Sequence, residues 1–370
     1  MADFTVTPWE VKGDIDYEKL ITEFGVQPVT DLPEIFCQNS LFSRRIIFAH
    51  RELDRILTAV KNKKPFVMMT GLMPTGKFHI GHMLVAQQII FYQSLGAKIY
   101  VAVADIEAYN ARGQSLDDSR NIALEEYLLN YIGLGLKPKN CEVYFQSARS
   151  KKSQRSNAYY RLQNILAKHA TFNEFRAVYG DITPGKILCA LLQASDMLHP
   201  QLNEFDGPIP VVVPVGIDQD PHIRLARDII NRVPQYKFVQ LSSTYHKFMP
   251  GLSGGKMSSS DPASFIALTD APEDAEKKIK KYAFSGGRAT VDEHRQHGGN
   301  PDIDVSFQYL KNFFESDDKK LNEIYHNYKS GRLLSGELKM ILAEKMKVFL
   351  KKHQQAREKG RKNIDKYLKG

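Results

Sequence analysis

The segment from Phe66 to Gly96 constrains the fold more than any other part of the sequence. Its first residues, Phe66 to Thr70, form a short apolar run that stops at Gly71, as is typical of a buried parallel strand. A turn through Pro74, Thr75 and Gly76 follows, and from Ile80 the apolar residues recur at helical spacing. We therefore expect a strand, a turn and a helix, the unit from which parallel α/β sheets are built.

Two histidines stand where this helix is expected to begin. A helix start presents unpaired backbone N–H groups and the positive end of its dipole, which suits a phosphate group. His79 and His82 are three residues apart, so on a helical first turn they would share a face and donate hydrogen bonds to phosphate oxygens. Gly81 between them would let a flat adenine approach the backbone. Solvated helix caps are the alternative, so the pair needs support from elsewhere.

The string from Lys256 to Ser260 (Lys-Met-Ser-Ser-Ser) supplies that support. It follows two glycines, lacks hydrophobic periodicity and is rich in hydroxyl groups, which favours a flexible anion-binding loop. Lys256 could place a compact positive charge on the β- and γ-phosphates of a nucleotide. A serine-rich surface linker is the alternative reading. Strand–helix units lie between the two strings, which favours one shared phosphate site.

The rest of the chain predicts a mixed architecture. Strands are expected at residues 66–70, 98–105, 141–146 and 209–216, with helical stretches between them. This alternation predicts a doubly wound, Rossmann-like parallel sheet over residues 61–271, with ligands at the carboxyl ends of its strands. Residues 1–60 are expected to form a mixed segment that is partly helical around 43–60. Residues 272–370 are expected to be an all-α domain, with 283–300 as a polar connector.

Charge is concentrated at one end of the chain. Residues 311–370 hold 16 Lys and Arg against 8 Asp and Glu, a net of +8 out of +9 for the whole sequence. This distribution suits a polyanion held by the C-terminal part, although Lys-rich helices are often merely solvated. Three scattered cysteines predict neither a metal site nor a disulfide framework. No membrane-length apolar run or targeting signal is visible, so we expect a soluble cytoplasmic protein.

Several strings identify the chain as similar to a known family. It resembles the tryptophanyl-tRNA synthetases of the archaeal and eukaryotic type, which are class I aminoacyl-tRNA synthetases. The two phosphate strings are the signature pair of that class, which tyrosyl enzymes share. The more specific strings are Thr7 to Glu10, Pro214 to His222, Ala283 to Arg288, Glu293 to Gln296 and Gly298 to Asn300.

The resemblance implies roles at the nucleotide. ATP, with Mg²⁺ carried by its phosphates and water rather than by a protein metal site, would react with tryptophan to give an adenylate, from which tRNA takes the acyl group. The residues implied in catalysis are His79, His82, Lys256, Ser258, Ser259 and Ser260. The residues implied in ATP binding are Pro74, Thr75, Gly76, His79, Gly81, His82, Lys256 and Met257.

The resemblance also implies an amino-acid site. Glu107, Gln193 and Gln219 match positions that hold the α-amino group, and a carboxylate with two amide oxygens suits an ammonium. Asp196, one turn beyond Gln193, is expected to face the same pocket. Eukaryotic relatives read the indole N–H with a tyrosine and a glutamine, but this chain has Met69 and Ala102 at those places.

The substrate reading therefore keeps two points open. Met69 could pack against a flat ring through its polarizable sulfur. Asp196 could accept a hydrogen bond from an indole N–H or from a phenol, so its partner is not assigned.

Three hypotheses follow. The first is a tryptophan–tRNA ligase, whose residues 272–370 bind the tRNA(Trp) anticodon. The second is a tyrosyl-tRNA synthetase. The third is an RNA-binding paralogue without catalysis, although such a paralogue would be expected to lose a signature histidine or Lys256, and all are present. A homodimer is expected from the resemblance only.

Overall fold

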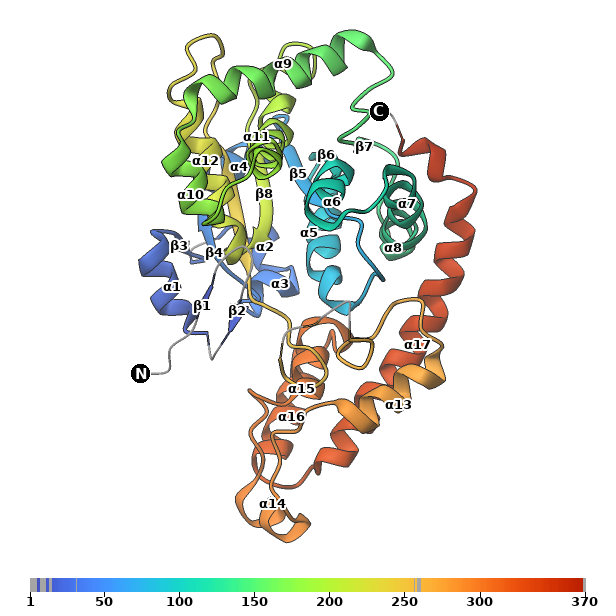
Figure 1. Cartoon of the computed structure of the whole chain (residues 1–370). Helices are drawn as coiled ribbons and strands as arrows, with labels where there is room; N and C mark the ends of the chain where they lie inside the picture. The colour runs from blue at the N-terminus through green and yellow to red at the C-terminus, as the bar shows by residue number, and fades with distance from the viewer. Residues whose placement is uncertain are drawn as a thin grey trace.

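A twisted sheet of seven strands lies at the centre of the described part of the molecule (Figure 1). This computed structural model describes residues 5–6, 11–12, 15–30, 32–255, 257 and 261–368. The strand order is β3-β4-β9-β8-β5-β6-β7. The strands are β3 (Gln27–Pro28), β4 (Ile47–Arg51), β5 (Val67–Leu72), β6 (Lys98–Val103), β7 (Cys141–Phe145), β8 (Val211–Gly216) and β9 (Ser242–His246). A separate antiparallel pair joins β1 (Thr5–Val6) to β2 (Val11–Lys12).

The described helices surround this sheet and build a second lobe below it (Figure 1). They are α1 (Tyr17–Phe24), α2 (Glu34–Cys37), α3 (Ser40–Ser43), α4 (Asp54–Lys61), α5 (Met83–Ser94), α6 (Asp105–Arg112), α7 (Leu116–Ile122), α8 (Leu129–Leu134), α9 (Ser153–His169), α10 (Phe172–Tyr179), α11 (Pro184–Leu198), α12 (Asp220–Ile230), α13 (Pro272–Tyr282), α14 (Val291–His297), α15 (Val305–Tyr309), α16 (Asp318–Lys329) and α17 (Ser335–Arg361).

The five strands from β9 to β7 are parallel, which confirms the predicted doubly wound sheet. From β5 the chain proceeds outward through β6 and β7 on one side, and later through β8 and β9 on the other. The strand order therefore reverses between β5 and β8. In open α/β sheets this reversal opens a crevice at the carboxyl ends of the strands, where ligands bind.

Alternation along the strands produces two apolar layers. Met68 and Val101 face one side and pack in a cluster with residues of α4, α5 and α8. Met69 and Tyr100 face the other side, in a cluster with residues of α9, α11 and α12. Both faces of the parallel strands are thus covered by helices, which explains why these strands read as continuous apolar runs.

Two predictions about local structure were incomplete. The segment expected to be partly helical around 43–60 contains the start of α4, but it also contains β4 (Ile47–Arg51), which pairs antiparallel with β9. Short apolar runs buried on all sides do not distinguish a strand from a helix. The connector expected at 283–300 contains α14, whose start is a capping box between Thr290 and Glu293.

Strand β9 was not predicted, because its residues are polar. Their hydroxyl groups nevertheless find partners in the core. Ser242 donates to the Glu52 carbonyl over 2.6 Å, and Thr244 donates to Gln88 Oε1 over 3.2 Å. A polar strand can be buried when each polar group is paired, and those partners lie far away in the sequence.

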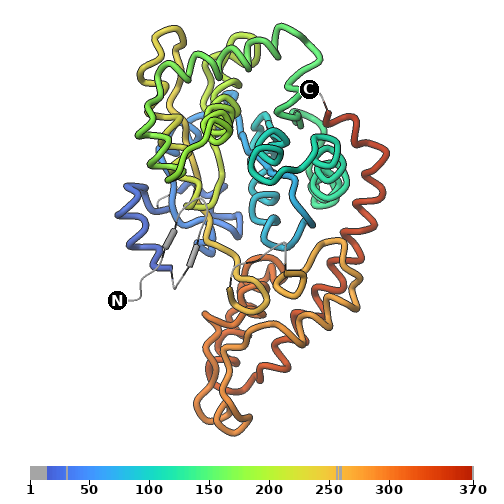
Figure 2. The backbone as a smooth tube through the Cα atoms, in the orientation of Figure 1, coloured from blue at the N-terminus to red at the C-terminus, as the bar shows by residue number. Residues whose placement is uncertain are grey.

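The C-terminal helix returns from the lower lobe to the edge of the sheet (Figure 2). Helix α17 packs along α13 and α8. On the way His353 Nε2 lies 2.7 Å from Asn130 Oδ1. Beyond the helix, the N–H of Val143 in β7 donates to the Tyr367 carbonyl over 2.9 Å, and the Tyr367 hydroxyl donates to the Leu136 carbonyl over 2.7 Å. The C-terminal end of the helical lobe is thus hydrogen-bonded to the edge strand of the sheet.

Candidate active site

A cavity of about 490 Å³ lies at the carboxyl ends of β5 and β8, where the strand order reverses. Its walls come from the ends of β5 and β8, from the starts of α6 and α12, and from α11. All the residues predicted for amino-acid binding line it, namely Met69, Glu107, Gln193, Asp196 and Gln219. The other lining residues are Thr70, Gly71, Leu72, Met73, Val85, Ala104, Arg112, Gln146, Met197, Val213, Pro214, Val215, Gly216, Asp218, His222, Ile223, His246 and Phe248.

The first phosphate string follows β5 at the edge of this cavity. Met73 lines the cavity, and the turn of Pro74, Thr75 and Gly76 comes directly after it. The turn is held by two side chains, since Gln114 Nε2 donates to the Pro74 carbonyl over 2.8 Å and the Tyr127 hydroxyl donates to the Thr75 carbonyl over 3.1 Å. The rest of the first phosphate string does not line the cavity, but leads away from its rim.

The sequence predicted that the two histidines stand on the first turn of an α-helix, and this prediction was wrong. His79 caps a 3₁₀ turn (Ile80–His82) that leads into α5. Their rings are nonetheless together, stacked with centroids 3.8 Å apart. The tighter turn places residues three apart almost above one another, which brings the rings into this stack.

Backbone hydrogen bonds define which nitrogen of each imidazole carries the proton. The Gly81 N–H donates to His79 Nδ1 over 3.2 Å, and the His79 N–H donates to His82 Nδ1 over 3.1 Å. A ring nitrogen that accepts has no proton, so in each neutral ring Nε2 is the donor. Burial lowers the pKa of His79 to about 4, and burial together with the neighbouring His79 lowers the pKa of His82 well below its usual value. Both rings are therefore neutral Nε2–H donors at pH 7.

The second phosphate string approaches the first. A methyl group added at Gly81 would lie 3.0 Å from Met257 Sδ and 3.0 Å from the His79 ring. The chain after the string pairs with the first string, because the Ile80 N–H donates to the Ile266 carbonyl over 3.1 Å. The two strings thus meet in space. Lys256, Ser258, Ser259 and Ser260, predicted to be catalytic, lie outside the described residues, as do Trp9 and its neighbours.

Glu107 and Gln193 form a hydrogen-bonded pair in the cavity wall. Gln193 Nε2 donates to Glu107 Oε2 over 2.7 Å, which joins α11 to α6. Burial raises the pKa of Glu107, the Gln193 bond opposes this effect, and nearby Asp196 adds to it. On the other wall Gln219 Nε2 donates to Asp218 Oδ2 over 2.9 Å. In both glutamines the amide nitrogen is occupied by a carboxylate, so each Oε1 is the group left to accept from an ammonium.

Asp196 accepts hydrogen bonds from three donors, which lie in β7, directly after β7 and in α9. Its Oδ1 accepts from the Tyr144 hydroxyl over 2.7 Å and from the Tyr159 hydroxyl over 2.6 Å, and its Oδ2 accepts from Gln146 Nε2 over 2.7 Å. Burial raises the pKa of Asp196 to about 6, against the lowering effect of these hydrogen bonds. The predicted placement of Asp196 beside Gln193 is correct, but most of its acceptor capacity is used inside the protein.

Sequence reasoning missed Gln146, Tyr144 and Tyr159. Gln146 follows directly after β7, just as Glu107 comes after β6, so the rule that ligands meet strand ends could have found it. Tyr144 lies within β7 and Tyr159 on α9, in an apolar helical pattern. Nothing in their local sequence distinguishes these tyrosines from ordinary core residues.

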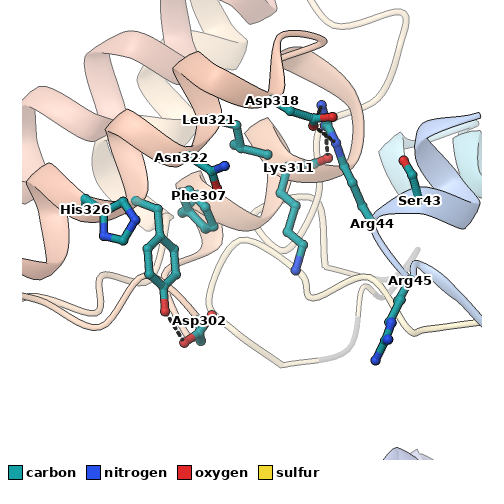
Figure 3. A pocket seen from close by; sticks show the side chains of 11 residues that line it. Ser43, Arg44, Arg45, Asp302, Phe307, Lys311, Asp318, Leu321, Asn322 and His326 are labelled. Atoms are coloured by element: carbon teal, nitrogen blue, oxygen red, sulfur yellow. Dashed lines mark hydrogen bonds and ion pairs between the residues drawn. The ribbon is translucent and has the colours of Figure 1, made fainter. Parts of the chain in front are cut away.

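A second cavity, of about 530 Å³, lies between α3 and the helices of the lower lobe (Figure 3). We call it the basic cleft; it is lined by Ser43, Arg44, Arg45, Asp302, Phe307, Lys311, Asp318, Leu321, Asn322, Tyr325 and His326. Arg44 pairs with Asp318 over 2.8 Å. Lys311 and Arg45 make no ion pair with any described residue. The pKa of nearby Lys247 is lowered mainly by burial, and the positive charges of Lys311 and Arg45 add to this effect. The cleft therefore carries uncompensated positive charge.

In the described ranges, no group of three or more His, Cys, Asp or Glu side chains is arranged to hold a metal ion. None of the helices in the same ranges is long and apolar enough to cross a membrane.

Comparison with known proteins identifies the family. The family described as tRNA synthetases class I (W and Y) matches residues 61–351. The chain belongs to this family. The synthetase is 44% identical to the tryptophan–tRNA ligase of Methanocaldococcus jannaschii, over 99% of this chain and 98% of the relative. It is 43% identical to the tryptophan–tRNA ligase of Hyperthermus butylicus, over 100% of this chain and 99% of the relative.

Solved structures of the family share the same fold. The tryptophanyl-tRNA synthetase of Aeropyrum pernix superposes on this synthetase with a TM-score of 0.90 at 41% identity, over 95% of this chain and 96% of that one. The enzyme of Encephalitozoon cuniculi, solved bound to tryptophan, superposes with a TM-score of 0.82 at 27% identity, over 96% and 98%. The resemblance predicted from the sequence strings is thereby confirmed.

Proposed function

We propose that this synthetase attaches tryptophan to tRNA(Trp) through a tryptophanyl-adenylate. The observation that carries the proposal is the position of the Glu107–Gln193 pair in a cavity whose rim leads into the stacked histidines. A site for an amino acid thus adjoins a site for phosphate groups. The full-length relatives named as tryptophan–tRNA ligases support tryptophan as the amino acid.

In the first step an oxygen of the tryptophan carboxylate attacks the α-phosphorus of ATP. The bond from that phosphorus to the bridging oxygen breaks, and pyrophosphate leaves. Negative charge develops on the phosphate oxygens, where the Nε2–H groups of His79 and His82 can donate without themselves transferring a proton. Lys256 and the serines after it would close over the β- and γ-phosphates. Mg²⁺ would arrive with ATP and neutralise the same charge.

The amino acid is held by its ammonium group. Glu107 supplies negative charge in a buried position, and the Oε1 atoms of Gln193 and Gln219 supply two neutral acceptors. These three groups would orient the tryptophan carboxylate toward His79 and His82. Positioning of this kind converts a bimolecular attack into an effectively unimolecular one, so no covalent nucleophile is required.

In the second step a terminal ribose hydroxyl of tRNA attacks the acyl carbon, the bond to the phosphate oxygen breaks, and AMP leaves. We assign binding of the tRNA anticodon to the helical residues 272–370. We assign part of the contacts with the tRNA phosphates to the basic cleft. Uncompensated Arg45 and Lys311 support this assignment, because cations without internal partners are free to pair with phosphates. A homodimer remains an expectation from the family.

Tyrosine is the less favoured substrate. A phenol needs a polar partner near its hydroxyl, and Met69 stands at the place where tyrosyl relatives have a tyrosine. Asp196, the other group that could bind a phenol, already accepts from three donors. A non-catalytic paralogue is also disfavoured, since the paired histidines keep a geometry suited to phosphate.

Exchange of labelled pyrophosphate into ATP tests the proposal. The assay is run separately with tryptophan, tyrosine and phenylalanine, without tRNA. We expect exchange with tryptophan and at least 100-fold less with the other two. Exchange that depends on tyrosine would establish the alternative enzyme, and inactivity with all three would exclude both enzymes. Charging of tRNA(Trp) transcript in the same preparation tests the second step.

A further inference from the structure

Gln146 lines the cavity, but neither the sequence nor the proposed reaction gives it a role. It directly follows β7, is 1% exposed, and stands in the cavity wall with Met69 and Asp196. The group that recognises the indole N–H is the part of the site left unassigned, because Met69 and Ala102 offer no side-chain oxygen or nitrogen acceptor there.

The orientation of the Gln146 amide follows from its partner. An ionised carboxylate only accepts hydrogen bonds, so the amide nitrogen must face Asp196, and Nε2 lies 2.7 Å from Asp196 Oδ2. Asp196 is itself held in place, since its Oδ1 accepts from Tyr144 and Tyr159. The network therefore directs the other end of the amide, Oε1, away from Asp196.

Gln146 Oε1 is buried and has no hydrogen-bond donor among the described residues. A buried carbonyl oxygen without a partner is costly, and such atoms are rare unless a ligand or water completes them. Indole carries one polar group, an N–H that only donates. Gln146 lines the cavity together with the apolar side chains of Met69 and Met197, and its acceptor-only oxygen matches that group.

We propose that Gln146 is a specificity-determining residue that accepts the indole N–H of tryptophan at its Oε1. Tyr144, Tyr159 and Asp196 act as positioning residues that hold the amide in this orientation. The inference rests on the assignment of the cavity to tryptophan. It makes recognition of the ring depend on a residue at the end of β7 rather than on Met69 or Ala102.

The test compares tryptophan with β-(benzothiophen-3-yl)alanine, in which a ring sulfur replaces the N–H. The measured quantity is the ratio of kcat/KM for the two amino acids in pyrophosphate exchange. The natural chain should prefer tryptophan by at least 100-fold, because a site built to hydrogen-bond a group rejects an analogue that lacks it. In Gln146→Met the ratio should fall at least tenfold. The ratio is insensitive to partial loss of folded protein, because both substrates are measured in one preparation.

Gln201→Met is the matched control. Gln201 is also buried, but its amide bonds only the backbone of Val239, and it does not line the cavity. Its ratio should equal that of the natural chain. If Gln146→Met does not fold, Gln146→Asn withdraws the same oxygen while keeping an amide, and its ratio should fall in the same way.

Two results would overturn the proposal. The first is a natural chain that does not distinguish the two amino acids. The second is a Gln146 variant whose ratio is unchanged. In that second case, a ratio that collapses in Asp196→Asn would assign the N–H to Asp196. Failure of the function itself looks different, since the natural chain would then show no exchange with tryptophan at all.

Discussion

The imidazole rings of His79 and His82 stack with their centroids 3.8 Å apart, and each ring accepts a backbone N–H at Nδ1. Two cationic rings could not lie this close without strong repulsion. The stack therefore excludes the state with two charged rings, and burial, which lowers both pKa values, keeps both rings neutral at pH 7 with an Nε2–H left to donate.

Removing either ring should slow adenylate formation. We expect His79→Ala and His82→Ala each to lower kcat in pyrophosphate exchange by about 100- to 1,000-fold, the usual effect of losing one preorganised donor. The KM for tryptophan should change little. His297→Ala, an exposed histidine on α14, is the control and should retain full exchange. A variant that raised the KM for tryptophan and left kcat intact would place the histidines in amino-acid binding instead.

Glu107→Gln should weaken tryptophan binding. The change keeps the size and leaves a hydrogen-bonding partner for Gln193 but removes the buried charge. A hydrogen bond to a charged group contributes about 1.5–3 kcal/mol, so the KM for tryptophan should rise about 10- to 100-fold, with little change in the KM for ATP. Glu323→Gln on the exposed side of α16 is the control. Equal changes in both KM values would argue for a general distortion of the site.

Lys256→Ala should lower the rate of adenylate formation without a large effect on tryptophan affinity. The lysine is assigned to the departing pyrophosphate, where its charge matters in the transition state. Single-turnover kinetics with saturating tryptophan would measure this rate directly. A rise in the tryptophan KM alone would contradict the assignment.

The basic cleft should contribute to the salt dependence of tRNA binding. Lys311→Gln and Arg45→Asn each remove one cation, and asparagine tolerates the positive φ of 52° at position 45. Each change should reduce the slope of log affinity against log salt concentration by about 0.7–0.9. Arg161→Gln on α9, outside residues 272–370 and the basic cleft, removes a cation already paired with Glu204 and is the control. Unaltered slopes in both variants would remove the cleft from the tRNA interface.

Buried histidines should make the fold sensitive to acid. Burial lowers the pKa of His222, His246 and His353 to about 4, whereas an unfolded histidine titrates near 6.5. Between these values the unfolded chain binds more protons, so the stability present above pH 6.5 is lost as the pH falls toward 4. Asp196, whose raised pKa is about 6, contributes in the opposite direction over pH 4 to 6.

Urea unfolding between pH 4.5 and 7.5 measures this dependence. His353→Gln should reduce the slope of the unfolding free energy by up to about 1.4 kcal/mol per pH unit, which corresponds to one proton. His353 lies outside the active site, so exchange activity should persist at pH 7.5. His297→Gln on the surface should leave the slope unchanged, and an identical slope in both variants would contradict the role of burial.

The strand, turn and helix around Pro74 illustrate what local sequence could predict. Apolar runs mark β5 to β8 because parallel strands are covered on both faces, and glycine with proline marks the turn. The order of strands and helices then places Glu107 and Gln219 near the cavity, because carboxyl ends of parallel strands meet at one edge. These inferences depend on residues close together in the chain.

Strands β4 and β9, the Gln146 network and the returning C-terminus could not be predicted in that way. The hydroxyl groups of β9 become buried only because Gln88 and Glu52 pair with them. The free oxygen of Gln146 exists only because Asp196 turns the amide, and Asp196 is held by tyrosines from β7 and α9. Hydrogen-bond pairing between distant segments has no local signature, so tertiary structure alone decided these features.

By itself, then, the sequence determined the α/β architecture, the two phosphate strings and the residues proposed to hold the substrate ammonium. Tertiary structure decided how the histidines stack, which imidazole nitrogens donate and which buried amide oxygen is left without a donor. The physical reason is that periodicity and turn chemistry act over neighbouring residues. Protonation state and amide orientation are set by partners that only folding brings within hydrogen-bond distance.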